Sequence, residues 1–289
     1  MPNGILIIDK PSDWTSMDVC ARVRRLLGER RVGHAGTLDP MATGVLPVFV
    51  GRATRAVEFA AEGEKEYVAG LRLGVVTDTQ DTSGTVLEER PVADLHQDLD
   101  RVLERFRGDI LQVPPMYSAV KVKGQKLYQL ARKGVEVERK PRPVTIHSLE
   151  LEEQESPRDF ILRVRCSKGT YVRTLCHDIG AALGCGGTMY SLRRTAACGF
   201  TEREAVSLDA LARAAEEGEA ERLLMPVESL FAAYPALTID GQALFRAKNG
   251  NPFSCGAADG TWRVRGPEGE FLLLGRCEGG IMKTIKSFF

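Results

Sequence analysis

Hydrophobic residues at the start of the chain predict a buried strand followed by an amphipathic helix. Residues 4–9 form a dense β-branched run bounded by a Lys-Pro pair, which is typical of a buried strand. Thr15 or Ser16 then offers a helix N-cap. The apolar residues that follow at helical spacing are Val19, Val23, Leu26 and Leu27. This pattern predicts a helix that ends at Gly28.

The pattern of later segments predicts a second helix and five more strands. Residues 94–107 form the clearest amphipathic segment, with apolar positions at Leu95, Leu99, Val102, Leu103 and Phe106. Residues 45–50 predict a strand, in which Pro47 indicates a sheet edge or a bulge. The other predicted strands cover residues 66–73, 117–122, 144–151 and 160–166.

The order of these elements favours an α+β fold with a mixed, largely antiparallel central sheet flanked by helices. Strands and helices alternate irregularly, and several strand pairs are joined by short loops. An Ala/Glu-rich helical stretch at 205–221 gives way to Pro226, Pro235 and Gly241, so we predict a main domain of residues 1–230. Residues 231–289 form the predicted smaller β-rich unit, with a helix at 243–248 and strands at 261–265, 271–274 and 282–289.

Composition is that of a globular protein. The chain has 289 residues, of which 43% are hydrophobic and 27% charged, and no apolar run approaches the ~20 residues of a membrane span. The N-terminus lacks the pattern of a signal segment, so we expect a soluble, cytoplasmic protein without membrane contact. Its 39 basic and 39 acidic residues cancel. Basic residues nevertheless gather at 22–31, 121–133, 139–142, 163–173 and 193–194, which allows one basic face for nucleic acid.

The cysteines and histidines argue against a metal or disulfide framework. Seven cysteines are an odd number and form no Cys-x-x-Cys pair, and four histidines are scattered along the chain. Structural zinc sites and disulfide scaffolds have more regular spacings. We therefore expect reduced thiols and neither a metal nor another cofactor.

Residues 31–46, Arg-Val-Gly-His-Ala-Gly-Thr-Leu-Asp-Pro-Met-Ala-Thr-Gly-Val-Leu, contain the most informative motif. Three glycines tolerate backbone angles that other residues resist, and Pro40 restricts Asp39 to extended or turn geometry. A carboxylate is thereby held at a fixed, exposed angle ahead of an apolar run. The alternative is a Gly-rich connection whose Asp-Pro only shapes a turn.

This segment resembles the catalytic motif of the pseudouridine synthases, and within them the TruB-type tRNA pseudouridine-55 synthases. The family pattern Gly-His-x-Gly-x-Leu-Asp-Pro-x-Ala-Thr-Gly is matched position for position. The resemblance implies an isomerase whose catalytic residue is Asp39 and whose substrate is uridine 55 in the TΨC arm of tRNA. It also implies that the target base leaves its stack, a step that costs a few kcal/mol.

Two further segments are similar to the family. Residues 3–16 resemble its opening motif, which makes Lys10 a candidate for a structural or phosphate contact, although Asp13 replaces a usual glycine. Residues 65–84 resemble the segment that supplies its active-site tyrosine, here Tyr67. An aromatic ring can return about 1–3 kcal/mol of lost stacking energy to an extruded base. From residue type alone, Tyr67 would be a core aromatic and Lys10 a surface lysine.

Residues 166–175 resemble the Lys-Gly-x-Tyr-x-Arg element of the family. Arg173 is the implied partner of Asp39, because guanidinium stays charged and can hold both carboxylate oxygens. Tyr171 and Leu192 would line the pocket, and His34 could fill the space that the flipped base vacates. Thr188 stands where relatives have histidine, which argues against RNA contact by that loop.

The resemblance extends over most of residues 3–200, and three functions remain to be compared. The first is a tRNA pseudouridine synthase, expected to be a monomer, with residues 1–230 as catalytic domain and 231–289 as a PUA-like RNA-binding appendage. The second is a non-catalytic tRNA-binding or folding factor. The third is a hydrolase of modified nucleosides, which would usually need a second carboxylate. The intact set of Asp39, Tyr67 and Arg173 favours the synthase, and no protein partner is implied.

Overall fold

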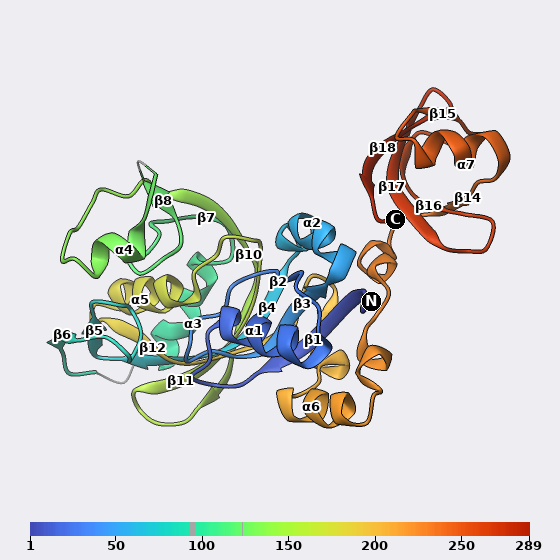
Figure 1. Ribbon diagram of the computed structural model, residues 1–289. Helices are drawn as coiled ribbons and strands as arrows, with labels where there is room; N and C mark the ends of the chain where they lie inside the picture. The colour runs from blue at the N-terminus through green and yellow to red at the C-terminus, as the bar shows by residue number, and fades with distance from the viewer. Residues whose placement is uncertain (93–95, 123) are drawn as a thin grey trace.

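The computed structural model describes residues 1–92, 96–122 and 124–289. The largest element is a nine-stranded mixed sheet with the order β1-β3-β12-β4-β11-β10-β7 (Figure 1). Its strands are β1 (Gly4–Lys10), β3 (Thr43–Val50), β12 (Gly187–Ala197), β4 (Lys65–Leu73), β11 (Asp159–Cys166), β10 (Arg142–Gln154) and β7 (Gly108–Gln112), with β2 (Val32–His34) on β3 and β13 (Phe200–Thr201) on β12. All these pairs are antiparallel except β3 with β12, so the predicted fold class is confirmed.

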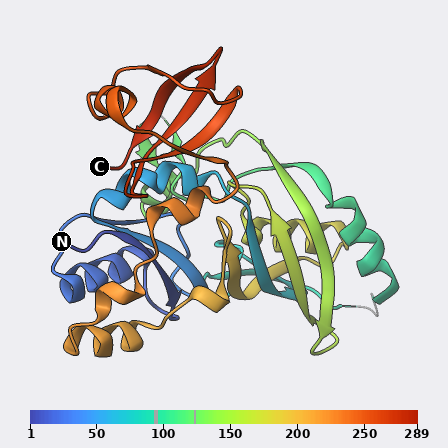
Figure 2. The ribbon, with the colours of Figure 1, turned by 90° about the vertical axis from the view of Figure 1, so that its right-hand side faces the viewer.

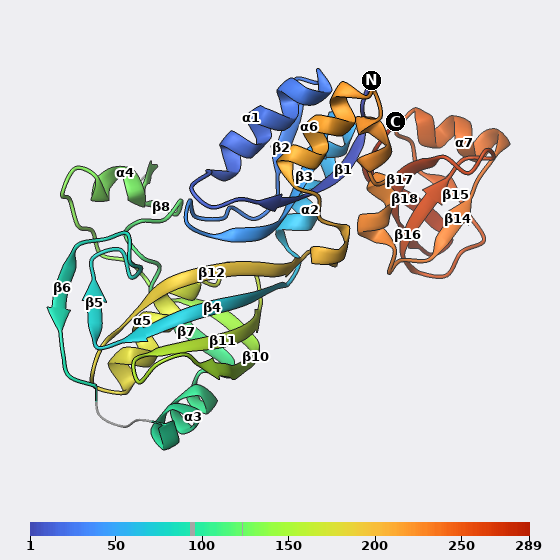
Figure 3. The same cartoon turned by 90° about the horizontal axis from the view of Figure 1, so that it is seen from below.

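Most helices of the main domain pack on one face of this sheet. The helices are α1 (Ser16–Leu27), α2 (Val57–Ala61), α3 (His96–Arg105), α5 (Val172–Ala182) and α6 (Leu208–Glu216), with 3-10 turns η1 (Gly51–Ala56), η2 (Glu202–Glu204), η3 (Ala220–Leu223) and η4 (Val227–Phe231). Helix α2 packs instead on the opposite face of β1 and β3. Helix α5 packs on β12 and β4, and α3 packs on β10 and α5. Figure 3 shows β12, β4, β11 and β10 side by side as long neighbouring strands. Leu71, Phe160 and Leu175 belong to the main core between these layers.

The predicted first strand and first helix are confirmed. Thr15 caps α1 with a reciprocal pair of hydrogen bonds to Asp18, and Gly28 ends the helix in the left-handed region at φ 63°. The second predicted helix is α3, of which Leu99, Val102 and Leu103 are buried. Residues 94 and 95 of that prediction lie outside the described residues.

The interpretation of Pro47 as a sheet edge or bulge is wrong. Strand β3 lies inside the sheet, with β1 on one side and β12 and then β2 on the other. Pro47 falls where the second side changes from β12, paired at Thr43 and Gly44, to β2, paired from Val48 onward. A residue without an N–H is tolerated in this gap.

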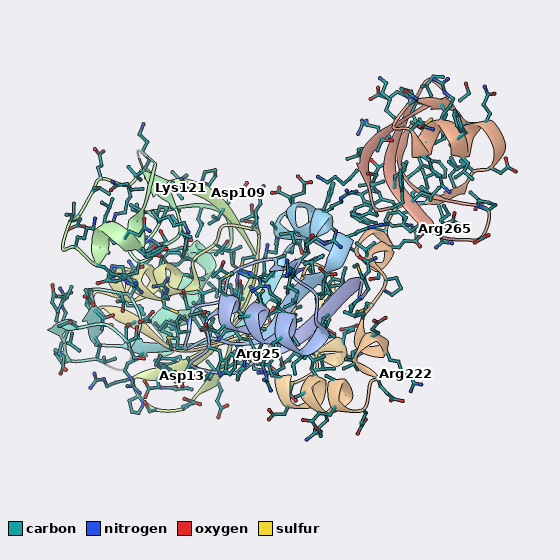
Figure 4. All side chains as sticks on the ribbon, viewed as in Figure 1. Asp13, Arg25, Asp109, Lys121, Arg222 and Arg265 are labelled. Carbon is teal, nitrogen blue, oxygen red and sulfur yellow. The ribbon has the colours of Figure 1, made fainter. Side chains whose placement is uncertain are left out.

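The predicted strand at 117–122 is also wrong in most of its length. Only β8 (Lys121–Val122) is a strand; it forms a short hairpin with β9 (Gln125–Lys126), followed by α4 (Leu127–Ala131). The carbonyls of Ser118 and Val120 accept hydrogen bonds from Tyr128 and Leu127 instead of a neighbouring strand. Lys121 marks this hairpin in Figure 4. A second hairpin, β5 (Val75–Thr77) with β6 (Val86–Glu89), extends from the end of β4.

The C-terminal residues form a separate five-stranded sheet, which stands apart from the main sheet in Figure 2. Its order is β14 (Ala236–Thr238), β16 (Gly260–Arg265), β17 (Phe271–Glu278), β18 (Ile281–Ser287) and β15 (Phe253–Ser254), with α7 (Gly241–Lys248) beside it. The predicted helix and the three predicted strands are therefore confirmed. Phe231 of η4 packs against Phe59, Phe271 and Phe288, which joins this unit to the rest. Arg265, labelled in Figure 4, donates to Glu228 at 2.7 Å.

In the part of the chain that the structure describes, no helix is long and apolar enough to cross a membrane.

Candidate active site

The loop between β2 and β3 carries Asp39, and neighbouring contacts fix its shape. Leu38 is buried in the main core. Its backbone N–H donates to the Ser16 hydroxyl at 2.9 Å, and its carbonyl accepts from that hydroxyl at 3.2 Å. The carbonyl of Pro40 accepts from the backbone N–H of Asp13 at 2.9 Å. With its two neighbours held in this way, Asp39 has little freedom to change direction, as the Gly-rich, Asp-Pro motif predicted.

Lys10 has a structural role in this arrangement. Its side chain is fully buried, and its ammonium donates to the carbonyls of Pro11, Trp14 and Pro40 at 2.8, 2.6 and 3.0 Å. An ammonium has three N–H donors, so none is left for a phosphate. Burial lowers the pKa of Lys10 to about 8. The substrate-binding role predicted for Lys10 is therefore wrong. Lys10 instead stabilises the Asp39 loop through buried hydrogen bonds to backbone carbonyls.

Arg173 lies against Asp39, the position that the sequence predicted for it. It is the second residue of α5, in the first turn after the N-cap residue Tyr171. Its Nε is 3.0 Å from Oδ2 of Asp39, and its Nη2 donates to Oδ1 at 3.4 Å. The Arg173 side chain is only 6% exposed, whereas that of Asp39 is 36% exposed. Arg173 thus binds the carboxylate of Asp39 from the protein side, and the opposite side of the carboxylate is exposed to solvent.

A second carboxylate, Asp81, lies on the other side of Arg173. Its Oδ2 is 3.5 Å from Nη1 of Arg173, and its side chain is 5% exposed. Its Oδ1 accepts from the Thr79 hydroxyl at 2.8 Å and from the Ser83 N–H at 3.0 Å. Arg173 also donates to the carbonyls of Thr79 and Tyr117 at 3.2 and 3.0 Å. This one guanidinium therefore joins the Asp39 loop, the 78–84 loop and the segment before β8.

The role of Asp81 has little basis in the local sequence. It lies in a polar loop between β5 and β6, where capping is the usual function of aspartate. The loop reaches the site because its backbone pairs with β12, with Met189 N–H donating to Gln80 at 3.1 Å and Thr82 N–H to Met189 at 3.0 Å. This long-range pairing could not be inferred from the local sequence.

The setting of Asp39 disfavours its negative charge. Burial raises the pKa of Asp39, Arg173 opposes that effect, and the negative charge of Asp81 adds to it. The net direction is a pKa above the ordinary value. A carboxylate of raised pKa is a stronger base and a better nucleophile than an ordinary surface aspartate.

Tyr67, Leu192 and Arg194 share one face of the sheet. Strand β4 pairs with β12 so that Ala69 lies opposite Leu192 and Tyr67 opposite Arg194, and alternate residues of a strand face the same side. Tyr67 and Leu192 are each 8% exposed. Burial raises the pKa of Tyr67, while the positive charge of Arg194 lowers it; the net direction is upward, and the Asp39 charge contributes to it. The phenol stays protonated near neutral pH.

His34 and Tyr171 are half-buried. His34 ends β2, and burial together with the Arg194 charge lowers its pKa, so the imidazole is neutral near pH 7. Its Nδ1 is buried without a hydrogen-bond partner in the described residues. The backbone of Tyr171 is held by Gln112, which accepts from its N–H at 3.0 Å and donates to its carbonyl at 3.2 Å.

Thr188 does not face a solvent-exposed loop. Its side chain is fully buried, and its hydroxyl lies 3.1 Å from that of Thr77, at the junction of β12 and β5. In this position the hydroxyl contributes to hairpin packing. Among the described residues, no group of three His, Cys, Asp or Glu side chains is arranged to hold a metal ion.

Two solved structures contain a chain with a similar fold. A Cbf5-Nop10-Gar1 complex includes a chain that matches with a TM-score of 0.76 at 29% identity, covering 100% of this chain and 85% of that one. An H/ACA ribonucleoprotein bound to a substrate RNA containing 2′-deoxyuridine matches with a TM-score of 0.75 at 26% identity, covering 100% and 86%.

Sequence comparison gives the family. Residues 24–172 match the TruB family pseudouridylate synthase N-terminal domain, and residues 173–232 match the tRNA pseudouridylate synthase B C-terminal domain. The tRNA pseudouridine synthase B of Azoarcus sp. strain BH72 is 49% identical over 237 residues, which are 82% of this chain and 78% of the relative. That of Clostridium kluyveri is 40% identical over 292 residues, 99% of each chain. The chain belongs to the TruB family of pseudouridylate synthases.

Proposed function

We propose that this chain, a tRNA pseudouridine synthase, isomerises uridine 55 in the TΨC arm of tRNA with Asp39 as the reacting group. The observation that carries the assignment is the arrangement of Asp39, which is paired with Arg173 on one side and exposed to solvent on the other. Family membership and the names of its relatives support the reaction and the tRNA substrate. The reaction is an isomerisation, so it needs no second substrate.

The chemistry breaks one bond and makes another. The bond from N1 of uracil to C1′ of the ribose breaks, the detached ring turns, and C5 bonds to the same C1′. The proton on C5 is lost and N1 gains one, so atoms and charge balance. Asp39 either attacks the sugar or the ring, or removes a sugar proton, and Arg173 holds its oxygens toward the substrate in each case.

The surrounding residues receive the extruded base. Tyr67 stacks on the uracil, Tyr171 and Leu192 line its pocket, and His34 occupies the space that the base leaves in the RNA. Tyr67 and Leu192 are supported in this role by their shared sheet face, and His34 by its place at the start of the Asp39 loop. Sequence-selective recognition of splayed bases by aromatic side chains is common in RNA-binding proteins.

The two sheets correspond to two proposed functional units. Residues 1–230 carry the chemistry, and residues 231–289 act as a PUA-like appendage that adds RNA affinity. The separate hydrophobic cluster of the second sheet supports the division. We also propose that the chain works as a monomer in the cytoplasm, because Asp39, Arg173 and Tyr67 all come from one chain and the named relatives are bacterial.

Tritium release tests this function. Unmodified tRNA carrying uridine labelled with tritium at C5 is incubated with the wild-type chain and with Asp39→Ala. We expect release by the wild type alone, since only formation of the new C5 bond expels that hydrogen. A second transcript with cytidine at position 55 tests the site, and it should release nothing. Tight binding without release by either protein would support the tRNA-binding factor, whereas free uracil in the products would support the hydrolase.

A further inference from the structure

Arg194 is a buried cation next to the active site, and the family motifs discussed above assign it no role. Its side chain is 1% exposed, and its Nε donates to the carbonyl of Val45 at 2.7 Å. Its Nη2 is buried without a hydrogen-bond partner in the described residues. The adjacent Arg193 points to the opposite face, where it pairs with Asp9 and Glu202. No such carboxylate partner of Arg194 occurs within 4.0 Å in the part of the chain that the structure describes.

The backbone of Arg194 lies where three strands meet. It pairs with Gly44 of β3 in parallel and with Tyr67 of β4 in antiparallel orientation. Gly44 has φ +98°, and a Cβ there would come within 2.2 Å of the Arg194 carbonyl oxygen. Only glycine permits this approach without strain. The end of the Asp39 loop therefore lies in close contact with the backbone of Arg194.

The side chain of Arg194 reaches the other parts of the site. A Cβ on Gly36, a residue with φ +72° in the Asp39 loop, would lie 3.1 Å from Nη1. Tyr67 is the direct cross-strand neighbour of Arg194, so both side chains share a face. The Arg194 charge opposes the rise in the pKa of Tyr67 and helps to lower the pKa of His34. One side chain thus lies beside the loop, bonds the start of β3 and shares a sheet face with the tyrosine.

Stability does not explain an arginine at this position. A buried guanidinium without a carboxylate, and with one nitrogen lacking an acceptor, costs free energy. Apolar residues that replace buried charged groups often leave stability unchanged or raise it. A residue that lowers stability at the edge of an active site is expected where function requires it.

We propose that Arg194 is a positioning residue that couples the Gly36 turn of the Asp39 loop to the Tyr67 hydroxyl. It keeps the carboxylate and the stacking ring in fixed relation before the uridine enters. Arg194 itself touches no reacting atom. This inference rests on the proposed function, because Asp39 and Tyr67 take their roles from it.

Matched variants of adjacent arginines test the proposal. Arg194→Met removes the buried charge, and Arg194→Lys keeps the charge but loses the planar guanidinium group. Arg193→Met and Arg193→Lys make the same two changes on the opposite face. We expect the single-turnover rate of both Arg194 variants to fall about 10- to 100-fold, because small misplacements of reacting groups have effects of that size. Their tRNA Kd stays at the wild-type value, and the Tm of Arg194→Met is not lowered. The Arg193 variants keep the wild-type rate.

A double-mutant cycle with Tyr67→Phe tests the coupling. If Arg194 acts through the hydroxyl, Arg194→Met slows the reaction less in the Phe background than in the wild type. Additive effects, a wild-type rate in Arg194→Met, or a Kd that rises as much as the rate falls would overturn the inference. Should Arg194→Met not fold, the same double-mutant cycle is measured with Arg194→Lys in its place, and the same criteria apply. Absence of tritium release by the wild type would refute the proposed function itself, which separates the two failures.

Discussion

The two faces of the central sheet carry the same kind of ion pair in opposite settings. On the helix-covered face, Arg173 is 6% exposed and lies between Asp39 and Asp81. On the opposite face, Arg163 of β11 is 37% exposed and lies between Glu66 and Glu152. Each arginine thus bridges two carboxylates, but only the guanidinium of Arg173 is itself buried.

The difference shows where charge costs free energy and where it does not. Exposed pairs contribute about 0–1 kcal/mol, since water solvates the separated charges almost as well. Buried ions lose several kcal/mol of solvation, so they persist where their partners are well placed or where chemistry needs them. We infer that Arg173 serves catalysis, whereas Arg163 serves the solvated surface.

Exchanging each arginine for lysine gives the largest expected contrast. Arg173→Lys keeps the positive charge but cannot hold both Asp39 oxygens and also donate to Thr79 and Tyr117. We expect the single-turnover rate to fall about 10²- to 10³-fold, the usual result of losing a buried, preorganised donor. Tritium release under single-turnover conditions measures it, and nitrocellulose filter binding reports the tRNA Kd, which should stay near wild type.

The matched control for that experiment is Arg163→Lys. It makes the same chemical change in an exposed bridge and should leave the rate unaltered. Equal losses in both variants would show that the ion pairs of the two faces are equivalent. That result would contradict the functional distinction between them.

Asp81→Asn gives the next largest effect and shifts the pH profile. We expect a rate about 10- to 100-fold lower, because Arg173 loses one of the two carboxylates that align it. Asp81 raises the pKa of Asp39, so its neutralisation lowers that pKa. Ionised Asp39 is the reactive form, and the rate rises as pH increases through its pKa. The acid limb of the rate–pH profile therefore moves to lower pH.

Asp78→Asn is the matched control for Asp81. Asp78 is exposed in the same loop, and its Oδ1 accepts from the Thr85 N–H at 2.7 Å, a bond that an asparagine oxygen can replace. Its rate and acid limb should match wild type. A shift of the acid limb to higher pH in Asp81→Asn would refute the electrostatic explanation.

Most of the fold could be predicted from local periodicity. The strand at β1, the capped helix α1 and the C-terminal β-rich unit follow from apolar spacing and from Thr15 and Gly28. The errors occurred where pairing is non-local. Pro47 indicated an edge because its sequence does not reveal that two different strands share one side of β3.

The site shows the same limit. The motif around Asp39 and the element around Arg173 predicted two residues that the fold brings within 3.0 Å. Neither Asp81 as the second carboxylate on Arg173 nor Arg194 as the neighbour of Tyr67 was predicted, because both relations depend on strand pairing. For Lys10 the sequence left a structural and a phosphate contact open, because it does not show that three carbonyls converge on the ammonium.

Replacing Asp39 should separate stability from activity. Its pKa in the folded chain is raised, so the native state binds the proton more readily than the unfolded state. Stability therefore falls as pH rises from the ordinary pKa through the folded one, and the ionised side chain destabilises the protein at neutral pH. We expect Asp39→Asn to lose turnover yet to melt a few degrees higher at neutral pH. The difference should vanish in acid, which thermal melts across pH would show.

Asp13→Asn is the control for that comparison. Asp13, labelled in Figure 4, is exposed at φ 65°, a left-handed conformation that asparagine also tolerates, and its backbone N–H donates to Pro40 of the Asp39 loop. Its Tm should equal that of wild type at each pH. A Tm of Asp39→Asn below wild type at neutral pH would mean that the Arg173 pair stabilises the fold more than desolvation opposes it.

The smallest effect should come from deleting the exposed bridge altogether. Arg163→Gln removes both ion pairs of Arg163, and we expect a loss of less than about 1 kcal/mol of unfolding free energy. Urea melts at low and high salt measure it, and the loss should shrink as salt screens the remaining pairs in the wild type. A loss of several kcal/mol, unchanged by salt, would show that water does not reach this face. Solvent exposure would then no longer distinguish the Arg163 pairs from the Arg173 pairs, and only the reactivity of Asp39 would do so.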